Sequence, residues 1–205
     1  MDENIINSCT VSGKVCSDLK MSHKSYGEGF YTFDIEIRRL SGYMDIIPVT
    51  LSERLILNMQ IEKGDEVEII GQLRTYNKME NGKNRLIISV FAREIYRVED
   101  EAASKNPNKV FLEGYICKEP IYRLTPLGRE ICDIMLAVNR AYNKSDYIPC
   151  ISWGRNAKYS KILDIGAHVR IIGRIQSRVY KKKYDEDNIE NKVAYEVSVL
   201  KMESI

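Results

Sequence analysis

One sequence pattern occurs twice in this chain, once in each half. The block from Gly64 to Leu73 reads Gly-x-x-Val-x-Ile-Ile-Gly-x-Leu, and it returns without a gap from Gly166 to Ile175. A repeat of this kind is the signature of two copies of one folding unit. A chain of 205 residues is long enough for two small domains with cores of their own. We therefore predict two similar domains, at 1–98 and 109–205, joined by a polar linker at 99–108.

Further segments correspond between the halves. Gly13 matches Gly114, the segment 33–35 matches 132–134, and Asp45-Ile46-Ile47-Pro48-Val49 matches Asp146-Tyr147-Ile148-Pro149-Cys150. We expect the repeated glycines to stand where a strongly curved strand bends or bulges, because glycine lets two backbones approach closely there.

The first half alternates apolar and polar residues in the manner of half-buried strands. Strands are predicted at residues 5–15, 30–39, 45–51, 66–74 and 85–98, with a loop at 17–29 and a short helix that Ser52 caps. Five curved strands with a helix between the third and fourth describe an oligonucleotide/oligosaccharide-binding (OB) barrel. The predicted fold class is thus all-β, with two tandem five-stranded OB-fold barrels, each with one such helix.

The segment from Asp146 to Gly154 carries the most informative alternation. Ile148, Cys150 and Ser152 share one face of the predicted strand, while the other face carries Tyr147, Pro149, Ile151 and Trp153, the only tryptophan. A tryptophan at a strand end is commonly part of a core. Beside Gly154 and Arg155, it also suits an open platform on which a nucleic-acid base stacks. This segment by itself favours the core interpretation, and the case for the platform rests on the rest of the chain.

Charge divides unevenly between the halves. Residues 1–100 contain 13 Lys/Arg and 16 Asp/Glu, whereas residues 101–205 contain 18 and 13. We therefore expect the second half to hold any polyanionic partner.

The cysteines and the hydropathy pattern indicate where the protein works. Five scattered cysteines without a Cys-x-x-Cys pair favour buried thiols in a reducing compartment over a disulfide framework or a zinc site. No signal peptide is recognisable, and no run approaches the roughly 18 apolar residues of a membrane helix. We expect a cytoplasmic protein without membrane contact.

Catalytic and metal-binding motifs are weak. His23 and His168 lie far apart without partners at metal spacing, and the sequence contains no phosphate-binding loop. The acidic residues at 185–190 favour a hairpin tip over a calcium loop. No enzyme activity, catalytic residue, metal or cofactor is expected.

Several motifs in order make the second half similar to a known family. These are residues 108–114, 119–123, 136–138, 146–154, 166–175 and 176–178. Residues 105–205 resemble the bacterial single-stranded DNA-binding protein (SSB) family in its form with two OB domains per chain. The first half resembles it more weakly, chiefly through residues 64–75.

The resemblance implies sequence-independent binding of single-stranded DNA in replication, recombination or repair. In that family bases stack on aromatic side chains, and the matching positions here hold Tyr142, Tyr147, Trp153 and Tyr180. Cations lie between these rings and would contact phosphates: Arg123, Arg129, Arg140, Lys144, Arg155, Arg174, Arg178, Lys181, Lys182 and Lys183. The lysine run also fits a solvated hairpin, because acidic residues follow it.

The first half departs from the family pattern. Ile46 and Ser52 correspond to Tyr147 and Trp153, and Tyr76 is displaced by two residues from the position of Tyr180. We expect the N-terminal domain to bind more weakly and to serve the assembly. The resemblance implies a homodimer with four OB folds. The chain lacks the acidic C-terminal tip of the family, which points to an accessory, plasmid, phage-type or primosome-like role.

The main competing hypothesis is an OB-fold protein-interaction or primosome-like accessory module without strong single-strand binding. It predicts Trp153 and Tyr180 buried in an interface. A nuclease accessory domain ranks third and requires a metal-binding carboxylate cluster. The sequence leaves open DNA versus RNA, the length of strand bound, whether the N-terminal domain binds nucleic acid, the chromosomal, plasmid or phage context, and the protein partners.

Overall fold

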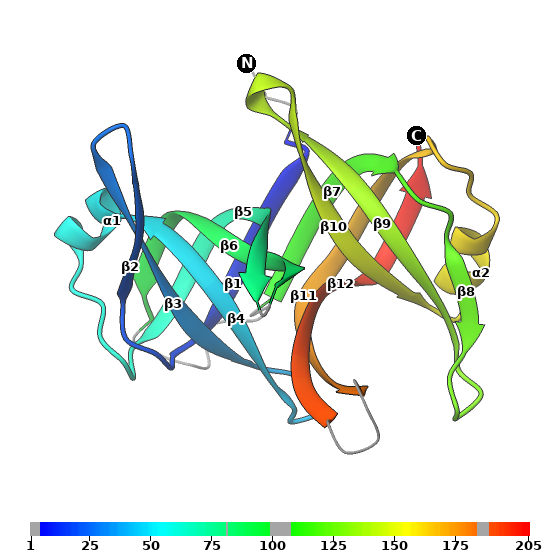
Figure 1. The fold of residues 1–205 in the computed structure, drawn as a ribbon, viewed down its shortest axis with the longest axis horizontal. Helices are drawn as coiled ribbons and strands as arrows, with labels where there is room; N and C mark the ends of the chain where they lie inside the picture. The colour runs from blue at the N-terminus through cyan, green and yellow to red at the C-terminus, as the bar shows by residue number, and fades with distance from the viewer. Residues whose placement is uncertain (1–4, 81, 99–107, 184–188) are drawn as a thin grey trace.

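The computed structural model describes residues 5–80, 82–98, 108–183 and 189–205 (Figure 1). The predicted linker, apart from Asn108, and the acidic segment 185–187 lie outside the described residues. The N-terminal half contains β1 (Asn7–Val15), β2 (Lys20–Ser25), β3 (Glu28–Arg38), β4 (Met44–Ser52), α1 (Glu53–Asn58), β5 (Glu66–Glu80) and β6 (Lys83–Arg97).

The C-terminal half repeats this order. It contains β7 (Asn108–Ile116), β8 (Ile121–Leu124), β9 (Glu130–Arg140), the 3₁₀ turn η2 (Ala141–Asn143), β10 (Lys144–Trp153), α2 (Arg155–Lys161), β11 (His168–Lys183) and β12 (Ile189–Ser204). The all-β fold with two OB barrels and one short helix in each is thereby confirmed. Ser52 caps α1 as expected, because its hydroxyl accepts from the Arg54 N–H at 3.1 Å.

The predicted loop at 17–29 was wrong in part, because β2 forms there and pairs with β3. All six side chains of β2 are exposed or half-buried. The segment therefore has no buried face to produce apolar alternation, and pairing with β3 makes it a strand. β8 takes the same place beside β9 in the second barrel.

The two barrels join through their first strands into one continuous sheet (Figure 1). β1 and β7 pair antiparallel, and the middle of that ladder sets Cys9 opposite Val110. These two residues are equivalent in the repeat, since each lies four residues before the matched Gly13 and Gly114. The barrels are thus related by a local two-fold axis that passes through the strand pair.

The repeated asparagines at the starts of β1 and β7 show the same relation. The Asn7 amide donates to the Leu73 carbonyl at 2.8 Å and accepts from the Leu73 N–H at 2.9 Å. Asn108 makes the same two bonds with Ile175, at 2.6 and 3.0 Å. Each side chain replaces a backbone partner, which satisfies polar groups where the barrel wall turns.

The repeated glycines occupy sites of close backbone approach. A Cβ on Gly13 would lie 2.4 Å from the Glu36 carbonyl oxygen, and one on Gly114 would lie 2.4 Å from that of Ala137. At Gly71 and Gly173 the sheet register shifts. The expected role of these glycines at bends and bulges is confirmed.

The match between 33–35 and 132–134 was two residues out of register. β3 pairs Phe33 with Val49, and β9 pairs Ile134 with Cys150. Since Val49 and Cys150 are equivalent, the true counterpart of Phe33 is Ile134. A two-residue shift preserves the apolar alternation of a strand, so the pattern alone does not exclude it.

One apolar core cluster extends through both barrels and includes Val11, Ile69, Leu112 and Ile171, all fully buried. The β1 and β7 pair lies between the two halves of this core. Within the described residues, no helix is long and apolar enough to cross a membrane.

Candidate nucleic-acid interface

β10 is half-buried, as its alternation predicts, and its outer face carries exposed aromatic rings. Ile148, Cys150 and Ser152 are at most 2% exposed, whereas Tyr147 is 51% and Trp153 39% exposed. Ile151 shares the outer face but is 3% exposed. The Ser152 hydroxyl is satisfied by Ser160 of α2 at 2.9 Å, so the helix closes the inner side of the strand.

Trp153 lines a groove of about 410 Å³, called here the Trp153 groove. The C-terminal barrel supplies Arg123 and Arg178 to its wall, and the turn between β3 and β4 supplies Arg39 and Tyr43. The Arg39 guanidinium lies 4.7 Å from the centre of the Tyr43 ring. Two rings and three arginines from the two barrels therefore line one groove.

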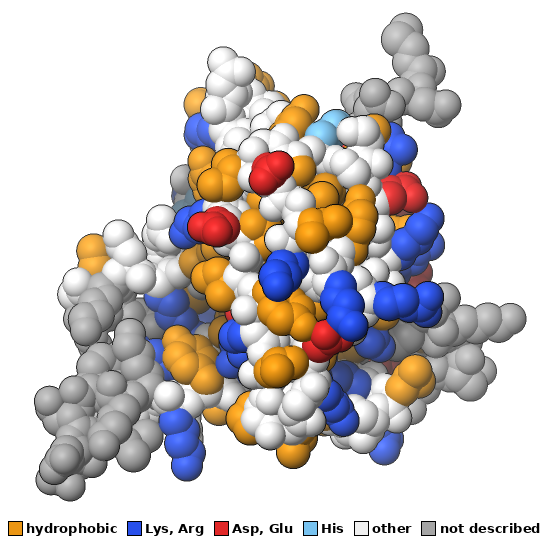
Figure 2. Space-filling model, turned by 90° about the vertical axis from the view of Figure 1, so that its right-hand side faces the viewer, with side chains coloured by type: hydrophobic (Ala, Val, Ile, Leu, Met, Phe, Trp, Pro, Cys, Tyr) orange, Lys and Arg blue, Asp and Glu red, His pale blue; other side chains and the backbone are white. Residues whose placement is uncertain are grey.

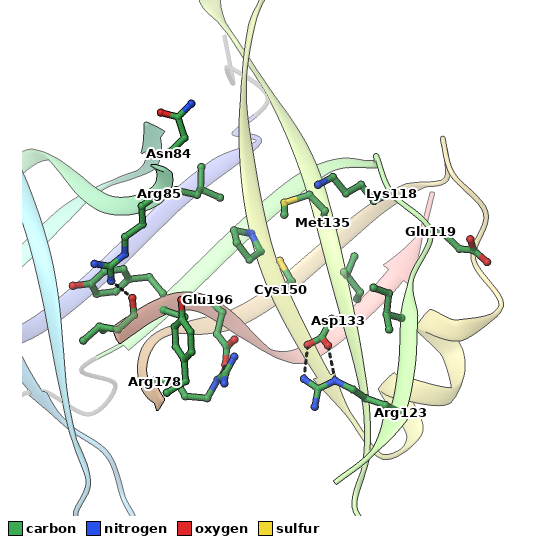
Figure 3. Close-up of a pocket in the computed structure, with 18 residues that line it drawn as sticks. Asn84, Arg85, Lys118, Glu119, Arg123, Asp133, Met135, Cys150, Arg178 and Glu196 are labelled. Atoms are coloured by element: carbon green, nitrogen blue, oxygen red, sulfur yellow. Dashed lines mark hydrogen bonds and ion pairs between the residues drawn. The ribbon is translucent and has the colours of Figure 1, made fainter. Parts of the chain in front are cut away.

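Tyr180 lines a second hollow of about 540 Å³, the junction groove (Figure 3). Its walls come from β8 to β12 of the C-terminal barrel and from β6 of the N-terminal barrel, which supplies Arg85. The Arg178 guanidinium lies 5.8 Å from the centre of the Tyr180 ring. Arg123 and Arg178 line both grooves, so the structure brings Trp153, Tyr180, Arg123 and Arg178 together.

Other predicted residues lie on the hairpin of β9 and β10. Tyr142 is 93% exposed at its tip and adopts a left-handed φ of 62°. Lys144 is exposed beside it, and Tyr147 lies farther along β10. The Tyr147 N–H donates to the Thr75 hydroxyl of the other barrel at 3.1 Å. The backbone of β10 at Tyr147 therefore lies against the N-terminal barrel.

Arg140, also on this hairpin, contacts a fully buried carboxylate. Asp146 accepts from Arg140 at 3.4 Å, from Arg74 at 3.0 Å, and from the Thr75 N–H at 2.8 Å. Burial lowers the pKa of Arg74, and Asp146 opposes that shift. Arg140 thus supports the carboxylate that joins the barrels through Arg74 and Thr75.

The local two-fold axis repeats this arrangement with Asp45. Asp45 accepts from the Ser177 N–H at 2.7 Å and from Arg39 through two bonds of 2.6 Å. The Ile46 N–H donates to the Ser177 hydroxyl at 3.2 Å, as Tyr147 does to Thr75. The hydrogen bonds to Asp45 raise the pKa of Arg39. We call Asp45 with Ser177, and Asp146 with Thr75, the two aspartate clasps.

The groove arginines already have carboxylate partners. Arg123 binds Asp133 at 2.8 and 3.2 Å, and this pairing raises the pKa of Arg123. Arg178 lies 3.7 Å from Glu196. A phosphate entering the grooves would have to compete with these carboxylates.

The remaining predicted cations lie outside the grooves. Lys144, Arg155 and Lys181 are exposed, and Arg129 is exposed in the turn after β8. Arg174 is half-buried on β11 and opposes Ser198. The side chains of Lys182 and Lys183 lie outside the described residues. Figure 2, which views the end formed by β8 and α2, shows lysine and arginine side chains interspersed with hydrophobic ones.

Comparison with known proteins identifies the family. Residues 107–205 match the model of the single-strand binding protein family. The chain is 32% identical over 83 residues to single-stranded DNA-binding protein B of Bacillus subtilis, which covers 37% of this chain and 74% of that protein.

The chain belongs to the single-strand binding protein family.

Other relatives agree with this membership. Single-stranded DNA-binding protein A of Bacillus subtilis is 34% identical over 83 residues, or 37% of this chain and 48% of that protein. The chain spans about half the length of the first curated relatives it matches, from 48% to 50%. The single-stranded DNA-binding protein of Thermus aquaticus, in a deletion mutant, superposes with a TM-score of 0.74, 20% identity, and coverage of 98% of this chain and 94% of that chain. That likeness supports the fold.

Sequence reasoning about this family member missed several residues of the grooves. The sequence predicts Arg38, Arg39, Arg74 and Arg85 as surface charges that could extend a phosphate path, and it predicts no role for Tyr43 or Tyr195. Tyr43 is 48% exposed in a turn, and Tyr195 is half-buried on β12. Their positions depend on how one barrel lies against the other, and a pattern within one barrel carries no such signal.

The part of the chain that the structure describes has no cluster of side chains suited to binding a metal ion. No group of three or more His, Cys, Asp or Glu residues there could hold a metal ion. All five cysteines are free. Burial raises the pKa of Cys9 to about 12 and that of Cys132 to about 11, so these thiols are poor nucleophiles.

Proposed function

We propose that this protein binds single-stranded DNA with little sequence preference, by stacking bases on aromatic rings and contacting phosphates through lysine and arginine. The rings are Trp153, Tyr180, Tyr147 and Tyr142, and the cations are Arg123, Arg178, Lys144, Arg155 and Lys181, with Arg140, Arg174 and Lys182 as further candidates. The activity is binding, and the proposal assigns no residue to catalysis.

The observation that carries the proposal is the position of Trp153. The only tryptophan of the chain is 39% exposed in a groove lined by three arginines and a second ring. A core would bury a tryptophan, because its apolar area is large. An exposed ring between cations provides a stacking surface and a charge for a base and its phosphate. Relatives named single-stranded DNA-binding proteins support the same ligand.

Fluorescence of Trp153 tests the proposal directly. Titration with oligo-dT at two salt concentrations should quench the emission, and binding should weaken as salt rises. Tyr147→Ala and Tyr180→Ala should each cost about 1 to 3 kcal/mol of binding free energy, the value of one stacked base. Oligo-U in the same assay compares RNA with DNA.

A different result would favour the competing function. Absence of quenching and of binding at low salt would refute the stacking model. The protein-interaction module would then replace it, and Trp153 would be expected to become buried when a protein partner binds.

We further propose a homodimer with four OB barrels that acts in the cytoplasm in replication, recombination or repair. On the sheet face away from the core, the half-buried Ile70, Phe111 and Ile172 lie at or beside the join of the barrels. A second copy would cover this apolar surface. Five unpaired cysteines suit a reducing compartment. Analytical ultracentrifugation tests the assembly, since a single-chain mass at working concentration would contradict the dimer.

A further inference from the structure

One buried carboxylate lines both the Trp153 groove and the junction groove. Glu196 of β12 is only 6% exposed, yet it contributes to the wall of each groove. Glutamate is almost never buried to this extent unless it is paired. In grooves proposed to hold a polyanion, a fixed negative charge repels phosphates. Phosphate binding therefore does not explain why a carboxylate stands here.

Glu196 is held through one of its two oxygens. The Gln176 amide donates to Oε1 at 2.8 Å, and the Arg178 Nε lies 3.7 Å from the same oxygen. Figure 3 shows Glu196 and Arg178 among the residues that line the junction groove. Within the described residues, Oε2 accepts no hydrogen bond, and no side-chain oxygen shielded from solvent lacks a partner. Oε2 is therefore an acceptor that a ligand can reach.

The repeat shows that the barrel fold does not require this carboxylate. β6 and β12 occupy equivalent places beside β4 and β10, where the ladders hold Val90 and Val197 at matching positions. The residue before each valine is Ser89 in the first barrel and Glu196 in the second. Ser89 is 3% exposed, so a short hydroxyl side chain suffices at that position. The carboxylate is specific to the barrel that carries the proposed stacking rings.

The Watson–Crick edge of a base decides whether it can use such an acceptor. An ionised carboxylate only accepts hydrogen bonds, and its two oxygens suit two neighbouring donors. Guanine alone among the DNA bases offers two adjacent donors, the ring N1–H and the N2 amine. Adenine and cytosine place an acceptor nitrogen beside their amine, and thymine has one N–H between two carbonyls. In a single strand this edge is free to be read.

We propose that Glu196 reads one base of the bound strand and favours guanine there, while the rings stack any base at the other positions. This inference rests on the proposed function and adds a base preference to it. Gln176 holds the carboxylate, and Arg178 can donate to the guanine O6 beside the two donors. The Arg178 side chain is 50% exposed, whereas that of Glu196 is 8% exposed. The carboxylate is thus the fixed part of the site and sets the preference.

The test compares strands that differ only in the base that alternates with thymine. Strands of about 10 nucleotides lie within the range of one OB barrel, and the alternating base is guanine, adenine, cytosine or hypoxanthine. Hypoxanthine keeps the N1–H and O6 of guanine and lacks the N2 amine. Lithium salt prevents guanine quartets. The midpoint of the Trp153 fluorescence titration gives the affinity.

Two protein variants accompany the strands. Glu196→Gln keeps the size of the side chain and can still bond Gln176, but it replaces one acceptor with a donor. Glu203→Gln is the matched control, because Glu203 is exposed on the same strand and lines neither groove.

The wild type should bind the guanine strand about 5- to 100-fold more tightly than the adenine or cytosine strand, the range of one bidentate contact to a base. The hypoxanthine strand should bind as the adenine strand does, since its second donor is missing. This comparison needs only the wild type, so it does not depend on the folding of a variant. Glu196→Gln should make the four affinities similar, and Glu203→Gln should keep the guanine preference.

Several results would overturn the inference. Equal binding of all four strands by the wild type would remove base reading from Glu196 and leave the proposed function intact. A guanine preference that survives in Glu196→Gln, or that hypoxanthine shares, would place the reading elsewhere. A preference for cytosine would assign the contact to Arg178. Guanosine monophosphate that competes as well as the guanine strand would make a free nucleotide the ligand. A wild type that binds no strand would overturn the proposed function as well.

Discussion

Gly114 shows how a single residue shapes a barrel. Its Cβ position lies 2.4 Å from the Ala137 carbonyl oxygen, and 3.1 Å from the carbonyl carbon. Those atoms belong to the backbone of β9, so they cannot move without disturbing the β7–β9 pairing. Glycine at this position permits the close approach that curves the wall of the barrel.

We therefore expect Gly114→Ala to lower the free energy of unfolding by about 2 to 3 kcal/mol, the upper part of the range for an overpacked core. Gly128→Ala is the control, because a Cβ there meets nothing within 4 Å. Its positive φ of 73° predicts a smaller loss of about 1 kcal/mol. Urea denaturation measures both. Equal losses would mean that the β7–β9 contact tolerates a methyl group.

Cys9 makes the stability of the barrel junction depend on pH. Burial raises its pKa from 9.0 to about 12 in the folded chain. Above pH 9 the unfolded chain loses this proton and the folded chain keeps it, so the free energy of unfolding falls between pH 9 and about 12. The full contribution is present below pH 9.

Comparison with Cys9→Ala isolates this effect. The stability difference between wild type and variant should stay constant from about pH 7 to about pH 8, and should shrink by about 1 kcal/mol at about pH 10. Urea unfolding of both proteins across this range provides the measurement. A constant difference up to about pH 11 would show that Cys9 ionises equally in both states.

At the scale of elements, the two aspartate clasps hold each barrel to a strand of the other. β4 of the N-terminal barrel presents Asp45 to Ser177 on β11, and β10 of the C-terminal barrel presents Asp146 to Thr75 on β5. Each carboxylate is at most 1% exposed and meets a backbone N–H, a hydroxyl and an arginine. A fully bonded buried carboxylate of this kind fixes geometry, because no water can replace a lost partner.

Removal of one clasp charge should therefore destabilise the pair of barrels. Asp146→Asn leaves Arg74 and Arg140 without their carboxylate, and we expect a loss of about 3 kcal/mol. Glu203→Gln breaks the exposed Lys201 pair and should cost less than about 1 kcal/mol. Thermal unfolding of both variants checks the contrast. A loss at Asp146→Asn no larger than that of the control would show that the clasp contributes nothing to stability.

At the scale of the whole molecule, the cations in and around the grooves would set the salt dependence of the proposed binding. Lys144, Arg155 and Lys181 are exposed and form no ion pair within the described part of the chain. Arg123 forms an ion pair with Asp133, and Arg178 forms one with Glu196. The number of arginines that leave a carboxylate to bind a phosphate can therefore be measured from how steeply the binding constant falls as salt rises.

On a single strand, each phosphate contact adds about −0.7 to the slope of log K, the binding constant, against log salt concentration. Three lysine and arginine contacts therefore predict a slope of about −2, and five predict about −3.5. Oligo-dT titrations over a series of salt concentrations give the value. Asp133→Asn should strengthen binding, since it frees Arg123 for phosphate. Weaker binding by that variant would show that Asp133 positions Arg123 for the ligand.

The sequence alone determined the repeated unit, the barrel fold, the glycine positions and which side chains share each face of β10. Those features depend on alternation and spacing within one stretch of chain, where the period of a strand fixes which side chains face outward. The same local pattern could not fix the register of β3, because a shift by two residues leaves every side chain on its own face.

The tertiary structure decided everything that lies between the barrels. Asp45 and Asp146 were recognised as matching residues, yet their partners stand 132 and 71 residues away along the chain. Tyr43, Arg85 and Tyr195 line grooves because two barrels meet around a local two-fold axis, and no periodicity records that meeting. Residues far apart in sequence become neighbours only when both cores have formed, so a composite groove is a property of the folded molecule.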